Sequence, residues 1–111
     1  MPHVVIEYSA DIGIDPMALV TKAHQGAIDS GLFSTADIKT RAYPAAHYIV
    51  AEGNKLFVHV TLYLLEGRTV AQKQHLSEAL SKSLLPLLKS GQHLSIDIRD
   101  LLRDIYKKHV A

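Results

Sequence analysis

The order of the hydrophobic patterns constrains the fold of this chain more than any other feature. A strand pattern, a capped helix pattern, a glycine and a second strand pattern follow one another within about 40 residues, and the same order then recurs. A helix that joins two strands of one sheet makes them parallel, with a right-handed crossover. The sequence therefore predicts an α/β fold built from two β-α-β units.

The first unit opens with residues 3–8, which are apolar on both faces, as is typical of a buried central strand. Asp15 and Pro16 then provide an N-cap and a proline at the first helical position. We expect this helix to end near Ser30, before Gly31. Its predicted buried positions are Met17, Val20, Ala23 (or His24) and Ala27.

The second strand of this unit covers residues 38–43, where apolar and charged positions alternate. Lys39 and Arg41 lie two residues apart and so point to the same side. Pro44 lacks a backbone donor and is expected to interrupt the strand, which would resume around residues 48–50. Gly53 and Asn54 then predict a turn.

The second unit begins with residues 56–65, the most convincing strand pattern, in which His59 is expected to be a hydrogen-bonded core histidine. Thr69 and Gln72 match a capping box that opens a second helix. Its leucines recur at helical spacing, and Pro86 is expected to kink or end it. A last alternating strand follows near residues 94–99, and residues 101–111 could form a short helix or an arm.

These patterns fit one domain, residues 1–111, with a four-stranded mixed sheet and two helices on one face. The other face would lack a cover although it also carries apolar residues, so we expect the chain to oligomerise. The edge segments around Tyr48 and after Ile98 are the candidates for pairing with neighbouring subunits.

Composition excludes several classes of function. The net charge is +1 and no basic stripe occurs, which argues against a nucleic-acid partner. The chain has no cysteine, so disulfides and thiolate chemistry are excluded. No apolar run approaches the ~20 residues of a membrane span, and no export signal is recognisable, so we expect no membrane partner and a cytoplasmic location. The seven histidines show no ligand spacing, so no metal site is expected.

Pro2 admits two interpretations. Proline is well tolerated at the first residue of a strand because it has no N–H to donate. Alternatively, removal of Met1, which is common before a small residue, would make Pro2 a free secondary amine. Such an amine can act as a general base where its surroundings lower its pKa towards the working pH. If Met1 stays in place, the Pro2 nitrogen is an amide and cannot act as a base.

Three cations could form an anion site beside this amine, although each alone could equally be a solvated surface charge. Arg68 directly precedes the Thr69 cap, where free N–H groups and the helix dipole already favour an anion. Lys39 and Arg41 share one side of a strand. Together with a basic Pro2, these side chains would suit an anionic substrate.

Several stretches of the sequence resemble those of a known family. The N-terminal stretch Met1-Pro2-His3-Val4-Val5-Ile6-Glu7-Tyr8-Ser9 resembles that of the 5-carboxymethyl-2-hydroxymuconate isomerases of the tautomerase superfamily. The resemblance continues through residues 31–33, 38–41 and 57–62 and the Gly67-Arg68-Thr69 loop, so it covers nearly the whole chain. One departure is Lys39, where some members carry arginine, since lysine keeps the charge but loses the planar fork.

The resemblance implies a homotrimer with no cofactor and no metal, in which Pro2 is the catalytic base after Met1 removal. Lys39, Arg41 and Arg68 would bind the carboxylates of the substrate, a muconate-type tricarboxylate from 4-hydroxyphenylacetate breakdown. The implied reaction isomerises a dienol to an unsaturated ketone. Two alternatives remain at this level. One is a tautomerase, hydratase or dehalogenase on another small unsaturated or enol acid, with Pro2 as acid; the other is a catalytically idle trimeric binding protein.

Overall fold

The computed structural model describes all 111 residues and contains four strands and two helices. In chain order these are β1 (His3–Ser9), α1 (Pro16–Asp29), β2 (Lys39–Ala45), β3 (Phe57–Leu65), α2 (Val70–Leu84) and β4 (His93–Leu101). Short 3₁₀ turns occupy Thr35–Asp37 and Leu85–Leu87. The predicted order of elements is confirmed.

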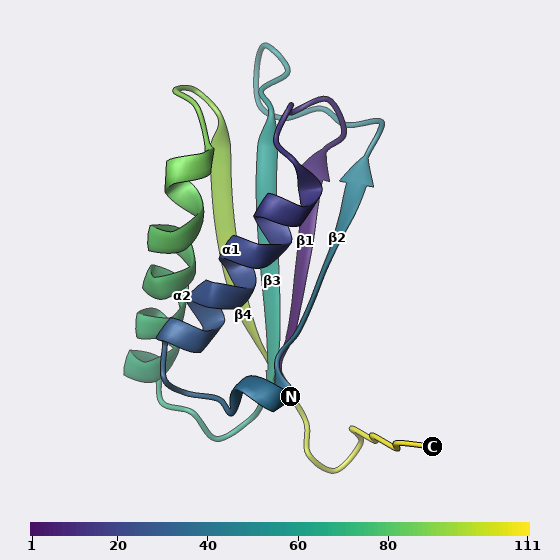
Figure 1. Cartoon of the computed structure of the whole chain (residues 1–111), viewed down its shortest axis with the longest axis vertical. Helices are drawn as coiled ribbons and strands as arrows, with labels where there is room; N and C mark the ends of the chain where they lie inside the picture. Colours follow the sequence, from purple (N-terminus) through teal and green to yellow (C-terminus); the bar gives the residue numbers. More distant parts are fainter.

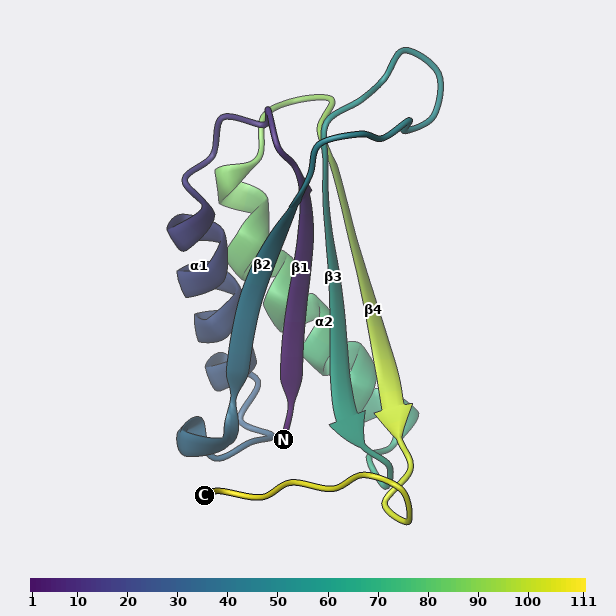
Figure 2. The same cartoon turned by 90° about the vertical axis from the view of Figure 1, so that its right-hand side faces the viewer.

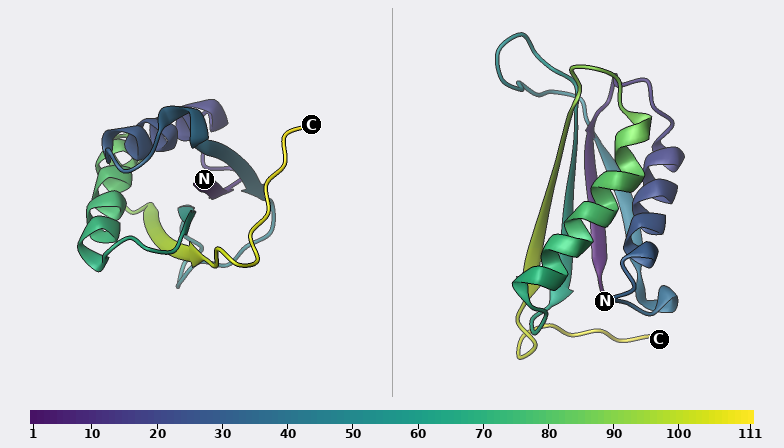
Figure 3. Two further views of the ribbon diagram at one scale, coloured as in Figure 1. Left: turned by 90° about the horizontal axis from the view of Figure 1, so that it is seen from below. Right: turned by 90° about the vertical axis from the view of Figure 1, so that its left-hand side faces the viewer.

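The four strands form one mixed sheet in the order β2-β1-β3-β4. Strand β1 is parallel to β2, and β3 is parallel to β4, so each β-α-β unit is confirmed. The two units join through the antiparallel pair β1 and β3. Both helices cover the same face of the sheet and leave the opposite face open (Figure 1, Figure 3).

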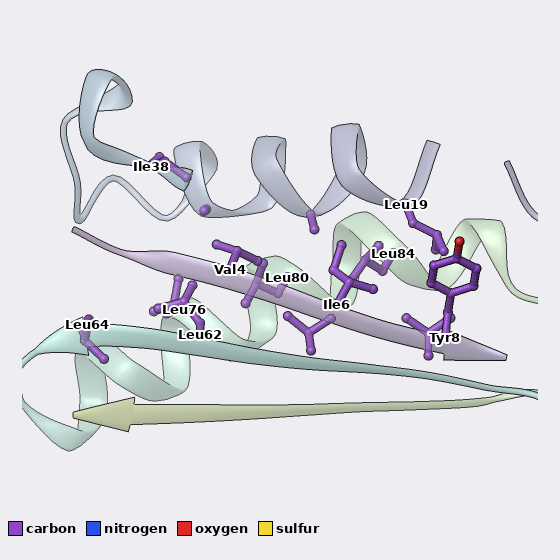
Figure 4. Packing of buried hydrophobic residues seen from close by; sticks show 14 of the residues in the cluster. Val4, Ile6, Tyr8, Leu19, Ile38, Leu62, Leu64, Leu76, Leu80 and Leu84 are labelled. Carbon is purple, nitrogen blue, oxygen red and sulfur yellow. The ribbon is translucent and has the colours of Figure 1, made fainter. Parts of the chain in front are cut away.

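The core lies between the sheet and the two helices (Figure 4). Alternate residues of β1 and β3 point into it, because successive side chains of a strand face opposite ways. Leu76, Leu80 and Leu84 of α2 complete it from the helical side, as their spacing predicts. The sheet is therefore held to the helices by a single apolar layer.

The buried stripe of α1 matches the predicted one only in part. Ala23 and Ala27 are buried as predicted, and Val20 is half-buried and packs against the core. Met17 is 62% exposed, so that prediction was wrong. The buried residues of α1 are Leu19, Ala23, Gly26 and Ala27. A Cβ at Gly26 would lie 3.1 Å from both the Ala79 carbonyl oxygen and the Leu80 Cα. Small residues were needed on this stripe because α1 and α2 pack closely there.

Pro44 does not interrupt its strand. It lies inside β2, opposite Tyr8, and β2 is an edge strand, where a missing N–H is tolerated. No strand resumes around residues 48–50. Instead the Tyr48 hydroxyl donates to the Asp11 carboxylate at 2.5 Å, and its ring packs edge-on against Phe57. The turn predicted at Gly53 and Asn54 is confirmed.

His59 lies on the open face of the sheet and not in the core. Val58 and Val60 take the two neighbouring positions on the helical side, so the residue between them must point away. Its Nδ1 lies 2.6 Å from the Ser95 Oγ and its Nε2 lies 3.2 Å from the Thr61 Oγ1. The prediction was correct for the hydrogen bonding and wrong for the burial.

Of the two predictions for the chain after β4, the arm is confirmed and the short helix is not. Residues 102–106 make a turn, in which the Tyr106 N–H donates to the Leu102 carbonyl at 3.1 Å, and the rest is extended. Figure 2 shows this C-terminal segment passing beneath the end of the sheet at which β1 begins. No helix of the structure is long and apolar enough to cross a membrane.

Candidate active site

Pro2 lies at the end of the sheet where β1 begins and is fully buried beneath Met1. Its carbonyl accepts the Lys39 N–H at 3.1 Å, which extends the β1–β2 ladder by one bond. The Met1 amine lies at the surface and donates to the Asp37 carbonyl at 3.3 Å. Removal of Met1 would therefore leave the Pro2 nitrogen at the mouth of a space that Met1 now occupies.

A cavity of about 170 Å³ opens beside Met1. Its walls include Met1, Phe33, Glu66, Arg68 and Arg103. Two guanidinium groups and one aromatic ring thus line the space beside Met1. The cavity can hold only a small ligand. Met1 does not close it, because the side chains of Arg68 and Arg103, which line it, are exposed.

Arg68 is held in this cavity by its neighbours in the loop. Thr69 forms the predicted capping box with Gln72, in which the Gln72 N–H donates to the Thr69 Oγ1 at 3.1 Å and the Thr69 N–H to the Gln72 Oε1 at 2.8 Å. This fixes the start of α2 directly after Arg68. The guanidinium donates to the Leu32 carbonyl and lies 5.6 Å from the centre of the Phe33 ring.

Lys39 and Arg41 lie on the other side of Pro2, on the edge strand β2. The Lys39 Nζ donates to the Asp37 carbonyl at 3.3 Å. The Arg41 Nη1 lies 3.1 Å from the Nδ1 of His3, the residue that follows Pro2. The structure therefore places all four predicted site residues at one end of the sheet. Arg68 lines the cavity beside Met1. Lys39 and Arg41 lie on the open face of the sheet, next to this cavity.

The electrostatics of this end disfavour positive charge on a basic group. Burial and then the charge of Lys39 lower the pKa of the Met1 amine, with a further contribution from Lys108 and an opposing one from Asp37. Burial and then Arg41 and Lys39 lower the pKa of the His3 imidazole. Amines and imidazoles at this end are therefore biased towards their neutral, proton-accepting forms.

Sequence reasoning missed four residues at this site. Phe33 packs against Arg68, and Arg103 reaches the cavity from the C-terminal segment. His3 and Tyr106 meet across the end of the sheet, with the His3 Nε2 3.0 Å from the Tyr106 hydroxyl. Arg103 and Tyr106 lie in a segment without hydrophobic periodicity, so no pattern could place them. His3 could have been found, because it shares a face with Lys39 and Arg41 in adjacent strands.

Solved structures share this architecture. A 5-carboxymethyl-2-hydroxymuconate delta-isomerase is 26% identical, with a TM-score of 0.79 over 100% of this chain and 89% of that one. A 5-carboxymethyl-2-hydroxymuconate isomerase from Deinococcus radiodurans R1 is 25% identical, with a TM-score of 0.79 over 99% and 90%. A fused 4-OT wild-type protein, a symmetric trimer, is 25% identical, with a TM-score of 0.76 over 98% and 91%. The fold is that of the tautomerase-superfamily isomerases.

A family model matches nearly the whole chain. The model of the 5-carboxymethyl-2-hydroxymuconate isomerase family matches residues 2–110, so the chain belongs to this family. It is thus an isomerase enzyme of the tautomerase superfamily, as the N-terminal motif and the Gly-Arg-Thr loop predicted. A search of curated proteins found no match.

Proposed function

We propose that the enzyme converts 5-carboxymethyl-2-hydroxymuconate, a dienol, to its unsaturated keto isomer in the breakdown of 4-hydroxyphenylacetate, with Pro2 as general base. The observation that supports this proposal best is the environment of the N-terminal amine. At the start of β1, burial and Lys39 already lower the pKa of an amine, even at the surface position that Met1 holds. Pro2 directly follows Met1 and pairs with Lys39 through its carbonyl, so after Met1 removal its amine would lie beside the same Lys39 charge.

The proposed reaction is a proton shift within the substrate. After Met1 removal, the neutral Pro2 nitrogen takes the proton of the substrate 2-hydroxyl, and a proton is delivered to carbon 5. The C2–O bond becomes a carbonyl and the two carbon–carbon double bonds become one, between C3 and C4. No electrons enter or leave the substrate, so the reaction needs no redox cofactor. A well-placed base typically contributes ~10²–10⁴-fold to such a step.

The cations give the substrate its orientation. Arg68 can bind one carboxylate in bidentate fashion, because its planar guanidinium can donate to both oxygens. The dipole at the N-terminus of α2 also favours a negative charge there. Arg41 and Lys39 can bind a second carboxylate on the other side of Pro2. A positive charge near C2 also stabilises the negative charge that develops on its oxygen. A tricarboxylate would thus be held on both sides of the base.

The proposed active assembly is a homotrimer. The open face of the sheet has no cover within the chain (Figure 3), and a fused relative of this fold is a symmetric trimer. Subunits that cover one another's open faces would also enclose the end where Pro2 lies, and would exclude water from the base.

The direct test is to mix the processed protein with the dienol and to follow the ultraviolet change as the ketone forms. We expect conversion well above the uncatalysed rate, and a loss of roughly 10²–10⁴-fold in Pro2→Ala. A rate equal to the uncatalysed one, or an unchanged rate in Pro2→Ala, would contradict the proposal.

A further inference from the structure

The C-terminal segment is anchored at the same end of the sheet as Pro2. As it leaves β4, the Arg103 N–H donates to the Glu66 carboxylate at 2.9 Å and the Arg103 Nη2 donates to the Glu66 carbonyl at 3.1 Å. The segment then crosses beneath β3 and β1 (Figure 2). This crossing brings Tyr106, which is 103 residues distant in sequence, to the His3 ring.

The His3 ring joins this segment to the edge strand. Its Nδ1 lies 3.1 Å from the Arg41 Nη1 and its Nε2 lies 3.0 Å from the Tyr106 hydroxyl. The His3 and Tyr106 rings also meet edge to face, with centres 6.1 Å apart. One imidazole therefore contacts a substrate-binding guanidinium with one nitrogen and the C-terminal segment with the other.

These two contacts determine where the proton of the imidazole lies. A guanidinium nitrogen can only donate, so the His3 Nδ1 must accept from Arg41. A neutral imidazole then carries its proton on Nε2 and donates it to the Tyr106 oxygen. The hydroxyl proton of Tyr106 is consequently not used by His3 and is free to be donated to another group.

We propose that His3 is a positioning residue, which couples the placement of the Arg41 guanidinium to the docking of the C-terminal segment through Tyr106. Arg41 is exposed on an edge strand, and the His3 contact is the hydrogen bond that holds its guanidinium. With Tyr106 in place, the ring is fixed from both nitrogens and Arg41 is presented beside Pro2. This inference rests on the proposed function only for the claim that Arg41 binds a substrate carboxylate.

The charges around His3 set the pH range in which the coupling works. Lys39 and Arg41 face it from β2. The N-terminal amine of Met1 lies two residues before it in the chain, and Lys108 of the C-terminal segment lies near that amine. Tyr63 is its neighbour on β3. Protonation would place an N–H on Nδ1 against the Arg41 N–H, so the imidazolium cannot hold the guanidinium. The coupling is present in the neutral form and is lost as the pH falls through the pKa of His3.

The first test compares Tyr106→Phe with Tyr43→Phe, since Tyr43 is an exposed tyrosine of β2 outside the site. In Tyr106→Phe we expect faster amide hydrogen exchange in residues 102–111 and a KM raised about 3- to 10-fold, as the loss of one part-buried hydrogen bond implies, with little change in kcat. The Tyr43→Phe variant should match the unsubstituted enzyme. Unchanged exchange and unchanged KM in Tyr106→Phe would overturn the inference.

The second test concerns His3 itself, and its spectroscopic part does not need the substrate. The ¹⁵N shifts of its ring should show a neutral imidazole with the proton on Nε2, and Tyr106→Phe should change the Nε2 signal. His3→Gln, whose amide can both accept and donate, should keep a KM close to that of the unsubstituted enzyme, whereas His3→Ala should raise it. A proton on Nδ1, or equal KM values in the two variants, would overturn the inference.

These two readouts separate the inference from the proposed function. If the dienol is not converted but the Nε2 tautomer and the Tyr106-dependent protection are found, the proposed function fails and the coupling of His3 to the C-terminal segment stands. If the dienol is converted but neither is found, the reverse holds.

Discussion

Arg68 illustrates how a single residue is placed by its backbone context. The capping box of α2 fixes the loop that precedes it, and the Leu32 carbonyl and the Phe33 ring hold its guanidinium in the cavity beside Met1. None of these partners neutralises its charge. The guanidinium therefore remains available for an anion, which is what a carboxylate-binding role requires.

Substitution of Arg68 should weaken substrate binding. We expect Arg68→Ala to raise KM about 10- to 100-fold, because a charge-assisted bidentate hydrogen bond is lost, and Arg68→Lys to recover part of this loss. Steady-state kinetics with the dienol measure both. Lys82→Ala, an exposed cation of α2 far from the cavity, is the matched control and should be silent. A KM within twofold of the unsubstituted value in Arg68→Ala would show that this arginine does not bind the substrate.

The pH dependence of the reaction reports the role of Pro2. A general base must be neutral, so kcat/KM should rise with pH through the pKa of the Pro2 amine. Burial and Lys39 lower the pKa of the terminal amine at this end, so the midpoint of the rise should lie below the ordinary pKa of such an amine. Protonation of His3 at low pH acts in the same direction, through Arg41. A rate that falls as the pH rises would instead assign Pro2 the role of an acid, as in the hydratase or dehalogenase alternative.

At the scale of the elements, the sequence predicted the strands better than the helix faces. The apolar run of β3, the alternation along β4 and the caps of α1 and α2 depend on local rules, and these predictions were confirmed. The buried stripe of α1 depends on how closely it approaches α2, which is a property of two elements. Helical spacing predicted the buried Ala23 and Ala27 correctly. The same spacing also selected Met17, which is exposed, and missed Leu19 and Gly26, which are buried.

The helix pair offers a test of this close approach. Gly26→Ala gains up to about 1 kcal/mol of helix propensity but places a methyl group against backbone atoms of α2, which typically costs about 1–3 kcal/mol. We therefore expect a net loss of about 1 kcal/mol in the free energy of unfolding, measured by chemical denaturation. Thr21→Ala on the exposed face of α1 is the control and should change stability by less than about 0.5 kcal/mol. An equally stable Gly26→Ala would show that the helices can move apart freely.

The site residues could be predicted where they lie in or directly next to a helix or strand, and not elsewhere. Lys39, Arg41 and Arg68 were found because strand alternation and a helix cap place them. The contacts of Arg103 and Tyr106 were not found, since they come from a segment that has no period and whose path is fixed by hydrogen bonds to Glu66 and His3. Interactions between segments this far apart in the chain cannot be inferred from local spacing.

At the scale of the whole molecule, the chain leaves apolar surface without a partner. Ile49 is 89% exposed in the loop beyond β2, and Ile105 and Val110 of the C-terminal segment are also exposed. Monomeric proteins rarely keep such groups together with an uncovered sheet face. We predict a mass of about three times 12.2 kDa in light scattering coupled to gel filtration. A monomer at micromolar concentration would contradict the trimer.

The proposed role of Pro2 as the catalytic base depends on whether Met1 has been removed. The most direct measurement is the rate of dienol conversion by two samples of the same protein: one with Met1 removed, and one in which Met1 is retained by inhibiting methionine aminopeptidase during expression. Mass spectrometry confirms the state of each sample. We predict conversion by the sample that begins with Pro2 and a rate roughly 10²–10⁴-fold lower in the other, where the Pro2 nitrogen is an amide. Equal rates in the two samples would contradict it.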